Sequence, residues 1–210
     1  VDSLTGNVRD VLEAAAAEGF ATPAAADAGV EHSTGFLRRG VDQAPIRLDA
    51  GDLGVDIGSG GGLPGLVLAG LTDGNWVLVD RAARRCTFLR WAVSELDLLD
   101  RVEVVCGDVV DVARGSLRGV ANLVTARGFG PPAMTLECGA PLLSEGGRLV
   151  VSEPPSGDSR WSQGVLRELD LVDEGSWHSG SANYRAFASG GSCPERYPRR
   201  NSRQVVDPLF

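Results

Sequence analysis

Lysine is absent from this sequence of 210 residues, and all of its 20 basic residues are arginines. The 28 acidic residues give a net charge of -8 at pH 7. An acidic protein binds nucleic acid poorly without a specific site, because phosphate contacts supply most of that affinity. Arginines cluster at 38–39, 81–90 and 196–203, however. These clusters leave two interpretations open, a local patch for an RNA partner or a solvated, arginine-rich tail.

Cysteine and histidine are also scarce. Cys86, Cys106, Cys138 and Cys193 lie far apart with no C-x-x-C pair, and the chain has 2 histidines. This pattern argues against a zinc site or a disulfide framework, so we expect no metal. Cys86 and Cys106 fall within apolar patterns, which predicts small core residues in a reducing compartment.

Long apolar runs are missing as well. No stretch reaches the roughly 18 residues that a membrane span needs. The first twenty residues carry Asp2, Asp10, Glu13 and Glu18, which is unlike a signal peptide. Apolar residues make up 43% of the chain, an ordinary share for a globular protein. We therefore expect a cytoplasmic protein without a membrane partner, and we favour a monomer.

Short apolar runs alternate with helical patterns from residue 52 onward. The runs predict strands over residues 53–57, 76–80, 102–106, 121–126 and 148–152. The patterns between them predict helices over 64–71, 82–96 and 131–143, with another helix over 161–169 and a terminal hairpin over 171–177 and 184–188. Apolar strands alternating with helices are typical of an α/β fold with a doubly wound, mostly parallel sheet.

The first fifty residues have a different pattern. Helical spacing over 7–18, with Thr5 as cap and Gly19 as stop, predicts one helix, and a short helix is expected near 33–39. Residues 21–34 give no clear signal. We divide the chain into a short N-terminal helical extension, residues 1–50, and a ligand-binding domain with a basic tail, residues 51–210.

The most informative segment is a glycine-rich loop after the first predicted strand. Residues 55–65 are Val-Asp-Ile-Gly-Ser-Gly-Gly-Gly-Leu-Pro-Gly, and such a loop lets the backbone approach a ligand closely. The spacing of Gly60, Gly62 and Gly65 also fits an NAD site, in which the loop binds a pyrophosphate. Asp56 would repel that group, whereas it suits the ammonium and sulfonium charges of S-adenosylmethionine (SAM). The charges favour SAM over a nicotinamide cofactor.

Two further carboxylates follow the next two strands. Asp80 ends the second strand, where an acid can accept hydrogen bonds from ribose hydroxyls, and Asp108 follows the third, where it can reach an adenine. Asp108 alone is better explained as a helix cap. Together with Asp56, these acids are expected at the carboxyl edge of the sheet, where open α/β folds bind ligands.

Four segments in order carry a family resemblance. They are the loop 56–65 with its Leu-Pro-Gly ending, residues 79–89 (an acid, then arginines, then Phe-Leu), Thr-Ala-Arg-Gly-Phe at 125–129, and Arg-Tyr-Pro-Arg-Arg at 196–200 with Pro-Leu at 208–209. This combination resembles the bacterial 16S rRNA guanine-N7 methyltransferases, the RsmG or GidB family, over about residues 52–210.

The resemblance implies a Rossmann-like class I SAM-dependent methyltransferase that acts on small-subunit ribosomal RNA or the small ribosomal subunit. The implied cofactor-binding residues are Asp56, Gly58, Ser59, Gly60, Gly62, Asp80, Arg81, Asp108 and Val109. Arg127 is the implied catalytic residue, beside the acceptor. The implied RNA-binding residues are Arg196, Tyr197, Arg199, Arg200 and Arg203.

The chemistry asks little of the protein beyond alignment. Methyl transfer from a sulfonium is an in-line displacement, and guanine N7 attacks with a free lone pair, so no general base is needed. Arg127 can then orient the base or balance charge, or it can form a salt bridge to Asp56 or Asp80. His178 has no evident partner and is expected to be structural or on the surface.

Other interpretations remain open. The net charge, a divergent N-terminus and Glu153, close to where the family usually has Lys-Gly, motivate a paralogue that methylates a small molecule or a protein. A third possibility is a protein that binds SAM without transferring its methyl group.

Overall fold

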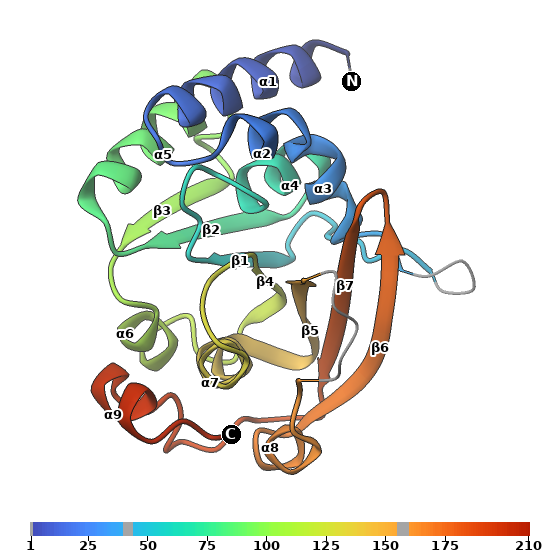
Figure 1. The fold of residues 1–210 in the computed structure, drawn as a ribbon, viewed down its shortest axis with the longest axis vertical. Coiled ribbons are helices and arrows are strands. Elements are labelled where there is room, and N and C mark those ends of the chain that lie inside the picture. Colours follow the sequence, from blue (N-terminus) through green and yellow to red (C-terminus); the bar gives the residue numbers. More distant parts are fainter. Residues whose placement is uncertain (1, 40–43, 155–159) are drawn as a thin grey trace.

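The computed structural model describes residues 2–39, 44–154 and 160–210, with strands and helices alternating from β1 to β5 (Figure 1). The strands are β1 Leu53–Ile57, β2 Asn75–Asp80, β3 Val102–Cys106, β4 Ala121–Ala126, β5 Leu143–Glu153, β6 Leu171–Ser179 and β7 Ala182–Ser189. The helices are α1 Asp2–Ala17, α2 Pro23–Asp27, α3 Gly29–Gly35, α4 Gly65–Leu71, α5 Ala83–Glu95, α6 Val109–Arg114, α7 Pro132–Gly139, α8 Gln163–Glu168 and α9 Asn201–Val206. A short 3-10 turn, Ala140–Leu142, joins α7 to β5.

These strands form a seven-stranded sheet in the order β3-β2-β1-β4-β5-β7-β6. The pairs from β3 to β5 are parallel, and β7 is antiparallel to both β5 and β6. The strand order reverses between β1 and β4, and at such a point the carboxyl ends of parallel strands leave a crevice for a ligand.

The sheet separates two apolar cores. Helices α1 and α3–α5 pack on one face, around Leu12, Phe36 and Trp76, and appear above the sheet in Figure 1. The helices α6–α8 and the C-terminal segment cover the other face, around Val124, Leu136 and Phe187. Covering both faces explains why the central strands are apolar at consecutive positions.

The predicted parallel strands are confirmed, and three of them, β1, β3 and β4, have the predicted bounds. The hairpin β6–β7 and the helices α5 and α8 are also confirmed. β5 begins five residues earlier than expected, since Gly146 at φ 71 carries the backbone through a bend within the strand. The short helices α2, α6 and α9 were not predicted, because each spans at most six residues and shows little periodicity.

The N-terminal predictions are partly wrong. Helix α1 begins at Asp2, so Thr5 lies inside the helix and does not cap it. The predicted stop is confirmed, because Gly19 adopts a φ of 74 after the last turn. The second predicted helix corresponds to α3, which begins at Gly29 rather than 33 and ends at Gly35 rather than 39. Among the described helices, none combines the length and apolar character of a membrane span.

One cysteine prediction is also wrong. Cys86 is fully buried in α5, as expected, but Cys106 is exposed. The reason is its place at the end of β3, which is an edge strand of the sheet and only partly covered.

The first turn of α4 lies unusually close to β1 and β2. A Cβ at Gly65 would lie 2.5 Å from Cβ of Asp56 and 2.6 Å from Cδ2 of Leu78. Neither neighbour can move freely, because both belong to buried central strands. Glycine is therefore required for this helix to pack against the sheet.

We expect Gly65→Ala to lower the free energy of unfolding by about 3 kcal/mol through overpacking. Gly164→Ala is the matched control, because its nearest neighbour is Oγ of Ser162 at an ordinary 3.7 Å. That control should leave stability unchanged or raise it by up to about 1 kcal/mol. Urea unfolding of both variants measures the effect, and similar stabilities would contradict the close packing at Gly65.

Candidate active site

The glycine-rich loop folds over the carboxyl ends of β1 and β2. Gly58, Gly60 and Gly62 have φ values of 73, 56 and 99, a region that residues with a Cβ rarely adopt. The N–H groups of Gly58 and Ser59 donate to the carbonyl of Val79 at 2.9 and 3.0 Å. These bonds hold the loop against β2 and leave its outer edge facing a cleft.

Asp56 lies beneath this loop and is 1% exposed. Its carboxylate accepts hydrogen bonds from Oγ1 of Thr125 at 2.7 Å and from the N–H of Gly65 at 3.2 Å. Burial raises the pKa of Asp56 to about 6, against the lowering effect of these bonds. The expected direct contact with the cofactor does not match this placement, because both carboxylate oxygens face the interior; Asp56 instead anchors the loop and α4.

Asp80 lies at the end of β2, at the wall of the cleft, and is 4% exposed. Its Oδ2 accepts a hydrogen bond from the N–H of Gly60 at 2.9 Å, and its Oδ1 accepts one from Ala82 at 2.8 Å. A guanidinium nitrogen of Arg85 lies 3.6 Å from Oδ2. The structure thus joins the loop and the predicted ribose-binding acid directly.

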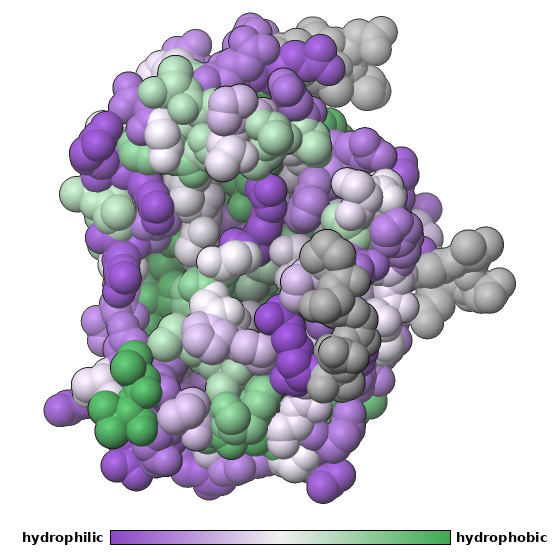
Figure 2. Space-filling model, viewed as in Figure 1, coloured by the Kyte–Doolittle hydropathy of each residue, from purple (hydrophilic) through white to green (hydrophobic). Residues whose placement is uncertain are grey.

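The cleft consists of two adjoining hollows, which share Gly58, Arg85 and Gly128. The first has a volume of about 400 Å³, and its lining includes Asp80, Arg81, Asp108, Val109, Phe129 and Met134. The second has a volume of about 330 Å³, and its lining includes Phe20, Thr22, Ser59, Gly60, Leu63 and Arg127. Figure 2 shows this face of the molecule, with a hollow beside the central strands that has apolar residues at its floor.

The predicted cofactor residues are largely brought together. Asp108 caps α6 through a 2.9 Å bond from the N–H of Val110 and also lines the first hollow, so both interpretations of this residue apply. Arg81 lines the same hollow from the exposed side. Gly62 does not line either hollow; it faces α4, where a Cβ would lie 2.9 Å from Cδ2 of Leu66.

Arg127 follows β4 and lines the second hollow as a half-buried side chain. Burial lowers the pKa of its guanidinium, and the nearby Tyr184 and Asp56 raise it. Within the described parts of the chain, no ion pair joins Arg127 to Asp56 or Asp80, so the expected alternative of a salt bridge is not supported. The charge of Arg127 is therefore available to the cleft.

Sequence reasoning missed several residues of the site. Arg85 lines both hollows and was recognised only as part of an arginine cluster. Phe129 packs against the loop, where a Cβ at Gly58 would lie 2.8 Å from its ring. His32, on α3, has a pKa lowered to about 4 by burial and by the charge of Arg127, so its imidazole is neutral. No sequence signal could connect His32 with a residue ninety-five positions away.

In the C-terminal tail, Tyr197 and Arg199 do not have the exposed placement that their predicted role in RNA binding requires. Tyr197 is 3% exposed, and its hydroxyl bonds with Glu168. The guanidinium of Arg199 binds both carboxylate oxygens of Glu137 at 2.8 Å. Glu137 is 1% exposed, so this ion pair fixes the tail to α7. Both side chains are thereby occupied within the fold.

The other tail arginines lie at the surface. Arg196 pairs with Glu168 at 3.0 Å, and Arg203 pairs with Asp207 at 2.7 Å. Arg200 is exposed at the start of α9. These three arginines are not part of the buried ion pair between Arg199 and Glu137. RNA binding by their side chains remains a proposal.

Glu153 does not present a free negative charge. Its carboxylate accepts a hydrogen bond from Nε1 of Trp161 at 2.6 Å and pairs with Arg185 at 3.4 Å. His178, expected to be structural or on the surface, is exposed, and its Nδ1 lies 2.9 Å from Oδ1 of Asn183. Within the described residues, no group of His, Cys, Asp and Glu side chains could hold a metal ion.

The family model for GidB, the rRNA small subunit methyltransferase G, matches residues 46–154, just over half of the chain. The chain belongs to the GidB family.

Relatives in this family carry the same description. The chain is 44% identical over 133 residues to the ribosomal RNA small subunit methyltransferase G of Salinispora arenicola, covering 60% of this chain and 54% of that protein. It is 40% identical over 129 residues to the Mycobacterium leprae (strain TN) protein of the same name, covering 60% and 52%. The match thus spans about half the length of these relatives.

Solved structures confirm the predicted class I fold. A SAM-dependent O-methyltransferase from Thermotoga maritima superposes with a TM-score of 0.56 at 16% identity, covering 70% of this chain and 62% of that one. An RNA methyltransferase from Salinibacter ruber, in complex with S-adenosyl-L-homocysteine, gives a TM-score of 0.52 at 19% identity, covering 70% and 87%. At such identities the likeness establishes the Rossmann-like α/β fold of SAM-dependent methyltransferases.

The buried carboxyl of Asp56 should give this GidB-family chain a measurable pH dependence. The folded state holds the proton up to a pKa of about 6, whereas the ordinary value is 3.8. The folded state therefore binds more protons in this window, and its stability falls as the pH rises through it. Relative to Asp56→Asn, the wild type should lose about 3 kcal/mol of unfolding free energy between about pH 4 and about pH 7.

Urea unfolding at a series of pH values measures this difference. The exposed Asp100 offers a control, since Asp100→Asn should follow the wild-type curve. If the Asp56→Asn curve runs parallel to the wild type, Asp56 is not held with a raised pKa.

The adjacent arginines 199 and 200 allow a second, matched test. Arg199→Ala leaves the buried carboxylate of Glu137 without its partner and should cost about 3 kcal/mol. Arg200→Ala removes an exposed side chain and should change stability by less than about 0.5 kcal/mol. Urea unfolding, with hydrogen exchange of the tail amides, compares the two, and equal effects would refute the anchoring role of Arg199.

Proposed function

We propose that this chain binds SAM in the cleft and transfers its methyl group to N7 of a guanine in small-subunit ribosomal RNA. The observation that carries the proposal is the contact between Asp80 and Gly60, which sets a carboxylate beside the glycine-rich loop at the mouth of a two-part cleft. Membership of the GidB family supports the ribosomal acceptor. That acceptor would place the reaction in the cytoplasm, with the small ribosomal subunit as partner.

The cleft suits SAM better than a nicotinamide dinucleotide. A pyrophosphate needs the free N–H groups at the start of a helix, but the N–H of Gly65 donates to Asp56, and that of Leu66 to the carbonyl of Gly62. The first hollow offers apolar surface from Val109 and Met134 for an adenine. Asp80 supplies a carboxylate for the ribose hydroxyls, a role in which it would exchange some of its present partners.

Arg127 is the residue we assign to the acceptor half of the cleft. SAM, when bound, supplies an electrophilic methyl on its sulfonium, and N7 needs no base to attack it. The guanidinium of Arg127 would orient the guanine by donating to O6, a hydrogen bond that leaves the N7 lone pair free. His32, neutral at physiological pH, does not add a competing charge behind Arg127.

The proposal is tested by transfer of labelled methyl from SAM to small ribosomal subunits from a strain that lacks this protein. Asp80→Asn removes a charge-assisted partner of the ribose and should weaken SAM binding by about 10- to 100-fold in calorimetry. Asp100→Asn, an exposed acid before β3, should bind SAM as the wild type does. Thermal unfolding of both variants separates lost binding from lost structure.

The outcome also decides between the acceptors. Label in the RNA that disappears with Asp80→Asn supports the ribosomal acceptor. SAM binding without label in the RNA would overturn it in favour of a small-molecule or protein acceptor, and SAM binding without transfer to any cell fraction would indicate a non-catalytic protein.

A further inference from the structure

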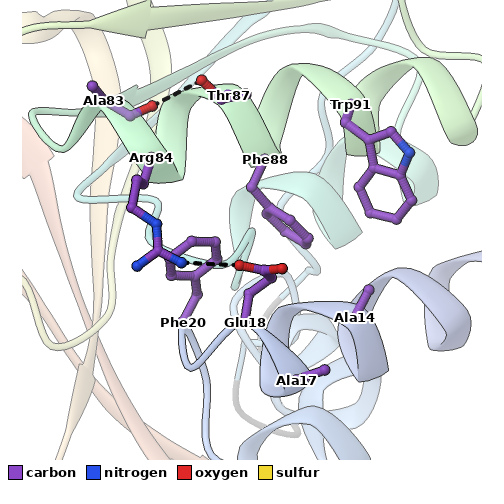
Figure 3. Close-up of a pocket in the computed structure, with 9 residues that line it drawn as sticks. All are labelled: Ala14, Ala17, Glu18, Phe20, Ala83, Arg84, Thr87, Phe88 and Trp91. Carbon is purple, nitrogen blue, oxygen red and sulfur yellow. Dashed lines mark hydrogen bonds and ion pairs between the residues drawn. The ribbon is translucent and has the colours of Figure 1, made fainter.

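An apolar groove lies outside the cleft, between α1 and the first turns of α5 (Figure 3). Its volume is about 640 Å³, larger than that of either hollow of the cleft. Phe88 and Trp91 point from α5 toward α1, and Ala14 and Ala17 form the opposite wall. The small alanines leave the ring of Trp91 open to solvent, whereas Phe88 is buried, at 8% exposed.

Trp91 is the feature that needs an explanation. It is 43% exposed, whereas Trp76, Trp161 and Trp177 are 1%, 5% and 9% exposed. Its ring lies 5.3 Å from that of Phe88, at an interplanar angle of 47°. A large aromatic ring held at the rim of an open groove provides a surface on which another planar group can stack.

Arginines connect this groove with the cleft. Arg84 lies at the end of the groove with its side chain 77% exposed, 3.0 Å from Glu18 and 5.4 Å from the centre of the Phe20 ring. Arg85, the next residue, lines both hollows of the cleft, and Arg81 lines the first of them. Arginines 81, 84 and 85 thus form a path from the cleft to the aromatic groove, in which Arg84 faces Glu18 and Arg85 faces Asp80.

We propose that this groove is a binding site for single-stranded RNA, in which one unstacked base lies against Trp91 and the adjoining phosphates contact Arg84. Proteins that bind single strands combine a basic path for the backbone with aromatic rings for the bases. The inference rests on the proposed function for its choice of RNA, and it adds a contact surface beside the cleft where the sequence pointed to the tail.

Charge favours RNA over a protein as the occupant. Glu18 and Arg84, the charged residues of the groove lining, pair with each other, so the excess positive charge comes from Arg81 and Arg85 at the adjoining cleft. The acids Asp10 and Glu13 of α1 are not part of that lining. An acidic protein of net charge -8 would use such a localised basic path to select the strand that enters the cleft.

The first test uses the fluorescence of Trp91 and the anisotropy of a labelled, single-stranded RNA of about twelve nucleotides. Stacking should quench the exposed Trp91 partially, since the other tryptophans are buried. Trp91→Ala should weaken binding about tenfold, and Trp91→Phe should retain most of it. Arg84→Ala should weaken binding and reduce the slope of log affinity against log salt by about 0.7.

Arg167→Ala is the matched control for charge, because Arg167 is an exposed arginine on α8, which packs on the other face of the sheet. It should bind RNA as the wild type does. If both Trp91→Ala and Arg84→Ala bind RNA as the wild type does, the groove is not an RNA-binding site. The same conclusion follows if peptides quench Trp91 and RNA does not. Circular dichroism of each variant checks that it folds.

Methyl transfer distinguishes the failure of this inference from the failure of the proposed function. If the wild type methylates ribosomal subunits and Trp91→Ala keeps the same KM, RNA binding by the groove is refuted and the proposed function is supported. If the wild type binds RNA through Trp91 but transfers no methyl group to it, the groove stands and the proposed reaction fails.

Discussion

The buried carboxylate of Asp56 is the constraint on which the rest of the site depends. It joins three elements, because β1 carries it, Thr125 of the distant strand β4 donates to it, and the N–H of Gly65 at the start of α4 completes it. Ionising this group inside the fold costs free energy, as its raised pKa indicates. In return, the hydrogen bonds to Asp56 fix the glycine-rich loop before a ligand arrives. Ligand binding then does not have to supply the free energy of ordering a flexible segment. The same contact removes the helix N–H that a pyrophosphate would need, so one interaction both shapes the cleft and selects against one ligand class.

Several arginines of this chain stabilise the fold itself and are not free to bind a ligand. Arg118 donates to the carbonyls of Tyr197, Cys193 and Pro194, and Arg101 donates to those of Ala69, Thr72 and Gly74. A planar guanidinium with five donors can satisfy several carbonyls at once, which a lysine cannot do with the same geometry. Charge clusters in the sequence therefore overstated the RNA-binding surface at the tail, where Arg199 is bound to Glu137.

The fold could be predicted further than the site. Apolar runs located β1 and β4 to the residue, because strands buried on both faces leave a direct signal in composition. They also located β3, although it is an edge strand that is only partly covered. Asp80 and Asp108 were found because their position after a strand fixes their place at the sheet edge. The orientation of Asp56 and the burial of Tyr197 could not be predicted from the sequence. Asp56 depends on a partner 69 positions away, and Tyr197 on one 29 positions away. A polar side chain in a sequence looks the same whether it faces a ligand or a buried hydrogen-bond donor.

The two halves of the cleft have different origins along the chain. The first hollow, the proposed cofactor half, is lined mainly by residues 58–134, all within the stretch that matches the family model. The second hollow is closed by Phe20, Ala21, Thr22 and Ala25. His32 approaches Arg127 from the same N-terminal region. Substitutions among the four residues that close the second hollow therefore change its wall, and those at Phe20 also reach the loop, where a Cβ at Gly61 would lie 3.2 Å from Cβ of Phe20. Divergence of the N-terminus is thus compatible with an intact first hollow, and under the proposed function it would act on the acceptor through the segment between α1 and α3.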